Sequence, residues 1–70
     1  MSGFTRADLF NVELRRLINE EIDRLKDEIA GGLLKSYEDY RAASGKVVGL
    51  RQCLEYMDEA DDNVRKRISS

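Results

Sequence analysis

The sequence DEIAGGLLKS, residues 27–36, decides the fold of this chain. Its two adjacent glycines, Gly31 and Gly32, separate two long helical patterns, and the chain contains no proline. Glycine adopts the left-handed conformation of a helix C-cap at no steric cost, so a helix can end here. We therefore predict an all-α fold in one domain over residues 1–70. It is an antiparallel hairpin with a helix over residues 6–30, a turn at 31–32 and a second helix over 33–67.

Before the glycines, apolar residues recur at spacings of three and four, which is typical of an amphipathic helix. Thr5 is a favoured N-cap residue type, and Asp8 follows three positions later, as in a capping box. On the polar face, Glu20 and Arg24 have the favourable i, i+4 order. Phe10 and Leu17 belong to the apolar pattern, and the predicted core residues of this helix are Leu14, Ile18, Ile22, Leu25 and Ile29.

After the glycines, the same spacing continues to the end of the chain and predicts a second core stripe. Its central residues are Val47, Leu50, Leu54 and Met57; it also includes Leu33, Tyr37, Tyr40, Ala43, Val64 and Ile68. The helix can begin at Leu33, or at Tyr37 with Ser36 as its cap and Asp39 three residues later. Gly45 is compatible with a kink, but the stripe keeps its phase there, so we predict a continuous helix. Asp61 and Arg65 form an i, i+4 pair near its end.

Small residues recur on another side of the second helix. A glycine inside a helix costs up to about 1 kcal/mol relative to alanine, so Gly45 and Gly49 require an explanation. Such a strip lets a second helix approach closely, as in small-xxx-small motifs. Tyrosine is frequent at binding hot spots, although Tyr37 and Tyr40 also fit the rim of a core. We predict an oligomer or partner interface at Ala42, Gly45, Gly49, Cys53, Tyr37 and Tyr40.

The composition offers little for catalysis or for cofactor binding. There is no histidine, and Cys53 is the only cysteine, so a structural zinc site and an intramolecular disulfide are both excluded. We interpret Cys53 as a small apolar residue that becomes buried. Carboxylates such as Glu20, Asp23 and Asp27 lie on polar helix faces that would not raise their pKa values. We expect no catalytic residues, no metal and no cofactor, and therefore no enzyme.

Charge and hydropathy narrow the classes of partner. The net charge is −2 and 37% of residues are charged, with both signs interspersed. Arg15, Arg16 and the run Arg65-Lys66-Arg67 could contact phosphates, but adjacent acidic residues argue against nucleic-acid binding. No apolar run reaches the roughly 20 residues that span a bilayer, and the N-terminus does not resemble a signal peptide. We therefore expect a cytosolic protein with no membrane partner.

Two segments of the second helix carry a resemblance: KSYEDYR, residues 35–41, and GKVVGL, residues 45–50. Together they resemble a pattern in small uncharacterised helical proteins of tailed bacteriophages, over about residues 18–57. The resemblance implies a virion or assembly role, in the host-cell cytoplasm or in the particle, and it brings no catalytic residues.

These features predict a structural or interaction protein that associates with itself and with phage or host proteins. A chain of 70 residues buries a small core, so self-association is a natural source of stability. The alternative is a small regulatory module that binds and modulates a host or phage protein.

Overall fold

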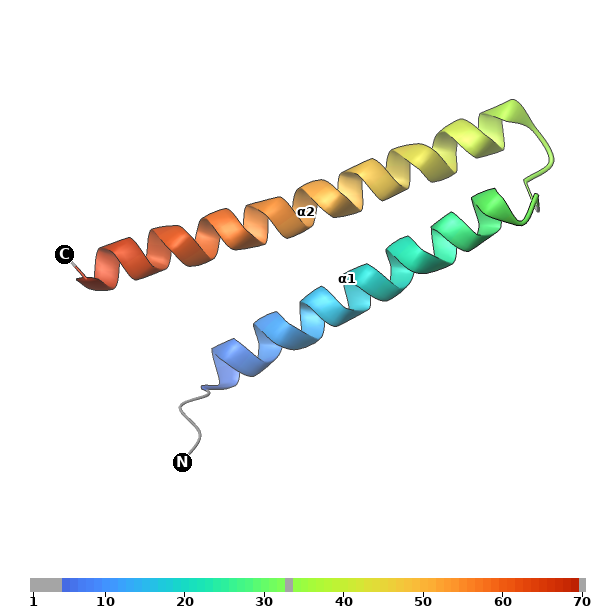
Figure 1. Cartoon of the computed structure of the whole chain (residues 1–70). Helices are drawn as coiled ribbons and strands as arrows, with labels where there is room; N and C mark the ends of the chain where they lie inside the picture. Colours follow the sequence, from blue (N-terminus) through green and yellow to red (C-terminus); the bar gives the residue numbers. More distant parts are fainter. Residues whose placement is uncertain (1–4, 33, 70) are drawn as a thin grey trace.

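The chain forms two antiparallel helices joined by a short connection (Figure 1). The computed structural model describes residues 5–32 and 34–69. Helix α1 spans Arg6–Ala30 and helix α2 spans Tyr37–Ser69. The two helices pack against each other, and the described residues contain no strand. The predicted all-α helical hairpin is therefore confirmed.

The start of α1 is fixed by the capping box that the sequence predicted. The backbone N–H of Asp8 donates to the Thr5 hydroxyl at 3.1 Å, and the Thr5 backbone N–H donates to the Asp8 carboxylate at 3.0 Å. Two backbone donors that the first helical turn leaves without partners are satisfied in this way.

The connection is longer than the predicted turn at 31–32. Gly31 keeps a right-handed conformation and its N–H donates to the carbonyl of Asp27, while Gly32 takes a positive φ of 70°. The Ser36 hydroxyl then accepts from the backbone N–H of Asp39 at 3.1 Å. Helix α2 consequently begins at Tyr37, the Ser36-capped alternative, and not at residue 33, which lies outside the described residues.

The hydrophobic core lies between the helices, in the half of the hairpin nearer the connection. Among the residues whose burial the structure describes, Ile22, Leu25, Ala43 and Val47 are buried, and Ile18, Ile29, Leu34, Leu50 and Leu54 pack against them. Two predicted core residues, Leu14 and Met57, are only half-buried and lie outside this cluster. Helix α2 continues through Gly45, as expected from the unbroken stripe.

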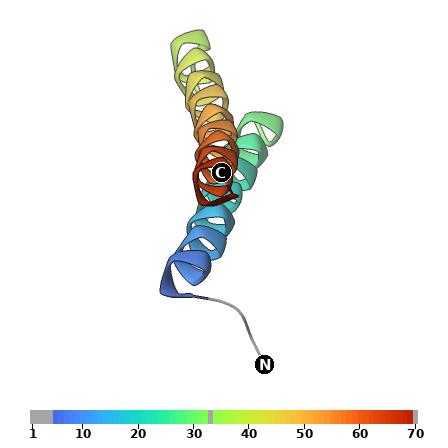
Figure 2. The ribbon, with the colours of Figure 1, turned by 90° about the vertical axis from the view of Figure 1, so that its left-hand side faces the viewer.

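The helices separate toward the chain ends. Figure 1 shows the gap between α1 and α2 widening away from the connection, and Figure 2 shows that the helix axes cross. The hairpin measures 51 × 26 × 13 Å and has a radius of gyration of 16.3 Å. A compact domain of this length has a radius of gyration of about 11 Å. The molecule is elongated, and its open end holds little of the core.

Candidate interaction surface

A groove of about 540 Å³ lies between the helices at the open end of the hairpin. We call it the open-end groove. Its apolar lining comes from both helices and consists of Ala7, Phe10, Val12, Leu14, Met57, Ala60 and Val64. Asp8, Asp61 and Arg65 also line it. The groove exists because the helices diverge beyond the core cluster and leave their apolar stripes without a facing side chain.

Large apolar side chains stand exposed in and beside this groove. Phe10 is 68% exposed, Val64 is 51% exposed and Leu17 is 49% exposed. The sequence placed all three on the stripes that should face the core. Single exposed apolar residues are ordinary, but a cluster that continues a core stripe is typical of an interaction site.

One ion pair joins the two helices beside the groove. The Arg15 guanidinium lies 2.7 Å from the Asp58 carboxylate, and its Nε donates to the side-chain oxygen of Asn11, also at 2.7 Å. Sequence reasoning missed this pair and assigned Arg15 only to a candidate phosphate patch. The spacing in the sequence could have indicated this pair. Arg15 is seven residues before Ile22 and Asp58 is four residues after Leu54, so both residues lie on the helix faces that carry the core stripes.

Charges of both signs line the groove. Asp61 and Arg65 form the predicted i, i+4 ion pair at 3.0 Å. The pKa of Asp8 is lowered, first by the hydrogen bond from the Thr5 backbone N–H, then by the Thr5 hydroxyl, and also by the charge of Arg65 on α2. The charged groups of the groove are therefore partly compensated within one chain.

A second, smaller hollow of about 340 Å³ lies near the connection. Apolar or small residues form part of its wall, namely Leu25, Leu34, Ala42 and Ala43. Glu28 on α1 and Lys46 on α2 also line it. The charge of Lys46 contributes to the lowered pKa of Glu21, after the larger effect of the hydrogen bond from Arg24.

Helical spacing puts the two hollows on the same side of the hairpin. Residues three, four or seven positions apart lie on the same face of a helix. On each helix, steps of this size connect residues that line the open-end groove with residues that line the second hollow. We call this side the docking face. Helix α1 contributes Phe10, Leu14, Leu17, Glu21 and Glu28, and α2 contributes Ala42, Lys46, Gly49, Cys53, Met57, Ala60 and Val64.

The predicted small-residue strip is exposed in the single chain. Ala42, Gly45, Gly49 and Cys53 are all exposed, and a Cβ atom added at either glycine would meet nothing within 4 Å. The interpretation of Cys53 as a buried residue is wrong for the single chain, because Cys53 lies on the flank of α2. Gly45 and Gly49 therefore leave open space beside α2 in the single chain.

The two candidate anchor tyrosines lie at the other end of the molecule. Tyr37 and Tyr40 stack on each other, with ring centroids 6.3 Å apart, and are 72% and 46% exposed. They do not join the core because the register that pairs Arg15 with Asp58 places them beyond the last turn of α1. The structure does not bring them together with the open-end groove.

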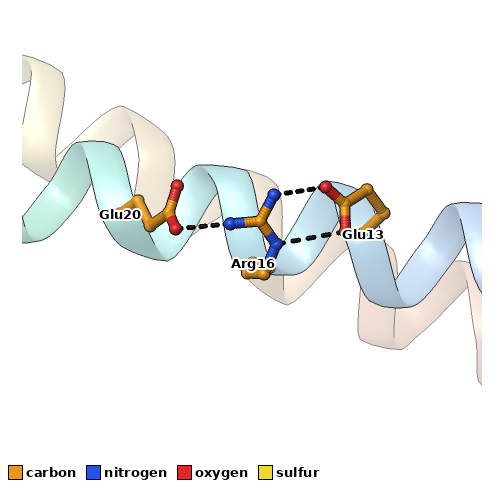
Figure 3. Close-up of polar contacts among 3 residues, drawn as sticks. All are labelled: Glu13, Arg16 and Glu20. Atoms are coloured by element: carbon orange, nitrogen blue, oxygen red, sulfur yellow. Dashed lines mark hydrogen bonds and ion pairs between the residues drawn. The ribbon is translucent and has the colours of Figure 1, made fainter.

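Ion pairs between residues three and four apart also run along α1 itself. Arg16 bridges Glu13 and Glu20 (Figure 3). Arg24 pairs with Glu21 and Glu28, so the predicted partner of Glu20 is replaced by Arg16. Hydrogen bonds from these arginines lower the pKa values of Glu13 and Glu21. Exposed helical pairs contribute only about 0.3–0.5 kcal/mol each, so they support the helix without defining a site.

Three of the arginines that were candidates for phosphate contact are paired with carboxylates. Arg15 pairs with Asp58, Arg16 with Glu13 and Glu20, and Arg65 with Asp61. Each would have to release a carboxylate before binding a phosphate. The apolar docking face is therefore the more distinctive surface of this molecule.

Residues 5–32 and 34–69 contain no group of three or more histidine, cysteine or acidic side chains placed to hold a metal ion. Neither helix in this part of the chain has an apolar stretch of the length that spans a membrane. Comparison of the chain with protein-family models, curated proteins and solved structures found no match.

Proposed function

We propose that this chain is a non-enzymatic structural or interaction protein that acts by helix–helix docking, beginning with self-association. The observation that supports the proposal is the exposed apolar surface at the open end, where Phe10 and Val64 line the open-end groove and Leu17 lies beside it. Fully burying an exposed side chain of this size contributes about 1.5–3 kcal/mol, so these partly exposed side chains contribute about 1–2 kcal/mol each, which favours association.

The area of exposed surface supports the same proposal. The chain exposes 5943 Å², whereas a compact protein of 8.0 kDa exposes about 4,500 Å². The excess is about 1,400 Å², and a standard protein interface buries about 800 Å² on each partner. One interface of ordinary size on the docking face would therefore remove more than half of the excess.

We place this activity in a tailed-bacteriophage virion or its assembly, in the infected cell or in the particle. This setting rests on the resemblance of residues 35–41 and 45–50. Mass spectrometry of purified particles tests it: peptides of this chain at a fixed ratio to a capsid or tail protein support the virion role. Their absence, with capture of one host protein in the infected cell, would favour a regulatory module instead.

A pair of neighbouring variants tests the docking face itself. Phe10 and Leu9 are both exposed, but Phe10 lines the open-end groove and Leu9 does not. Phe10→Ser should weaken dimerisation about tenfold or more, because truncating a buried aromatic anchor costs 1.4 kcal/mol or more. Leu9→Ser is the matched control and should dimerise as the unmodified chain does.

Sedimentation equilibrium measures the dissociation constants, and circular dichroism checks that both variants keep their helices. If both variants dimerise as strongly as the unmodified chain, the open-end groove is not part of the interface. Loss of dimer in both would show that general apolar exposure, and not this groove, drives association.

A further inference from the structure

We propose that the partner on the docking face is a second copy laid face to face with the first, with both connections at the same end. In this arrangement α1 of each hairpin lies against α2 of the other, and the four helices form one bundle. The inference rests on the self-association proposed above and specifies its geometry.

Residue types change along the docking face. Its residues at the open end, such as Phe10, Leu14 and Val64, are apolar, whereas those near the connection include Glu28 and Lys46. When both connections lie at the same end, apolar surface meets apolar surface. The reverse arrangement, with connections at opposite ends, would bury Phe10 against the charged half of the partner's α1.

The positions of the charged residues along the two helices also favour connections at the same end. Arg15 and Asp58 are level with each other along the hairpin. Because the helices are antiparallel, the residue twelve positions before Asp58 on α2 lies opposite the residue twelve positions after Arg15 on α1. Lys46 therefore lies opposite Asp27 and next to Glu28. With connections at the same end, Lys46 of each copy lies over the partner's Glu28, and two cation–carboxylate contacts form across the interface. In the reverse arrangement α1 lies over the partner's α1, so Glu28 gains no lysine from the partner and keeps only its pair with Arg24 of its own chain.

The small residues fit the same geometry. Gly49 and Cys53 lie on the docking face midway along the hairpin, where a facing helix must pass. An added Cβ at Gly49 meets nothing within 4 Å in the single chain, so the space is open for the partner's α1. A bundle of two hairpins related by a two-fold axis is a closed arrangement, which limits assembly to the dimer.

The single cysteine gives a direct test by oxidative cross-linking. Cys53 is five residues before Asp58, which pairs with Arg15, so Cys53 lies opposite the residue five positions after Arg15, residue 20 on α1. With connections at the same end, Cys53 faces the partner's α1 between Leu17 and Glu21. With connections at opposite ends, α2 lies over the partner's α2, and the two copies of Cys53 meet near the two-fold axis.

The test uses Leu17→Cys and Glu21→Cys, which bracket that level by about one helical turn, and Asn19→Cys as a control on the opposite face of α1. A disulfide needs Cα atoms within about 7 Å of each other. Within one chain, Cys53 and the introduced cysteine point to the same side of two packed helices whose axes are about 8–10 Å apart, so their Cα atoms are too far apart for a disulfide. Covalent dimer on a non-reducing gel therefore reports contact between copies.

The proposal predicts covalent dimer as the major oxidised species for Leu17→Cys or Glu21→Cys. It predicts little for Asn19→Cys or the unmodified chain. Covalent dimer from the unmodified chain would overturn the same-end arrangement while self-association stands. A dimeric mass with no cross-link in any variant would also overturn it. A monomeric mass for the unmodified chain would refute the self-association itself.

Discussion

Replacing Gly45 with alanine should stabilise the hairpin, because Gly45 lies inside α2 and its surroundings are empty. A Cβ atom added there meets nothing within 4 Å, and the backbone of Gly45 does not have a positive φ. Alanine is favoured over glycine in a helix interior by about 1 kcal/mol. The substitution adds no clash that would offset this gain, so the free energy of unfolding should rise by about 1 kcal/mol.

For a domain of this size, 1 kcal/mol corresponds to a rise of roughly 4–8 °C in Tm. Thermal unfolding followed by far-ultraviolet circular dichroism measures the shift. Protein concentration must be the same for all samples, because association makes Tm depend on it. Gly32→Ala is the matched control: Gly32 has φ = 70°, which strains any residue with a Cβ, so its Tm should fall.

A fall in Tm for Gly45→Ala would refute this reasoning. It would mean that another helix closely approaches Gly45 in solution and occupies the space that is open in the single chain. The interface would then extend around α2 beyond the docking face, to the full strip that the sequence predicted.

Three further predictions address the interface, the ion pair between the helices and the response to acid. Gly49→Leu should weaken dimerisation and leave helix content unchanged, because Gly49 lies on the docking face; unchanged dimerisation in sedimentation equilibrium would remove Gly49 from the interface. Asp58→Ala should lower the free energy of unfolding by less than about 1 kcal/mol in urea denaturation, since its carboxylate is largely exposed. A much larger loss would show that the pair with Arg15 becomes buried on assembly. The pKa of Asp8 in the folded chain lies below its ordinary value of 3.8. The ionised carboxylate therefore stabilises the fold fully at pH values above 3.8, and this stabilisation is lost as the pH falls through the pKa of the folded chain. Asp8→Asn should therefore reduce the fall in Tm below about pH 4, and an unchanged fall would assign acid sensitivity to other carboxylates.

Much of the fold follows from local signals in the sequence. Gly31 and Gly32 mark the break, Thr5 with Asp8 caps the first helix, and Ser36 with Asp39 caps the second. Each of these signals depends on residues no more than four apart, so a single sequence contains all the information needed. The unbroken apolar spacing across Gly45 likewise predicted a continuous α2.

The remaining features depend on how the two helices are placed relative to each other. Tyr37 and Tyr40 continue the apolar spacing, but they are exposed because α1 ends before their level is reached. Phe10 and Leu14 continue it too, but the helices diverge there and leave a groove. The pair of Arg15 with Asp58 needs the register between helices, which periodicity along one helix does not contain.

The molar mass of the purified chain in solution, measured by light scattering across a concentration series, decides whether the hairpin self-associates. We expect a dimer of twice the 8.0 kDa chain mass, dissociating only on dilution. A folded monomer at every concentration, with the helix content of the hairpin, would contradict it and leave the docking face for another protein.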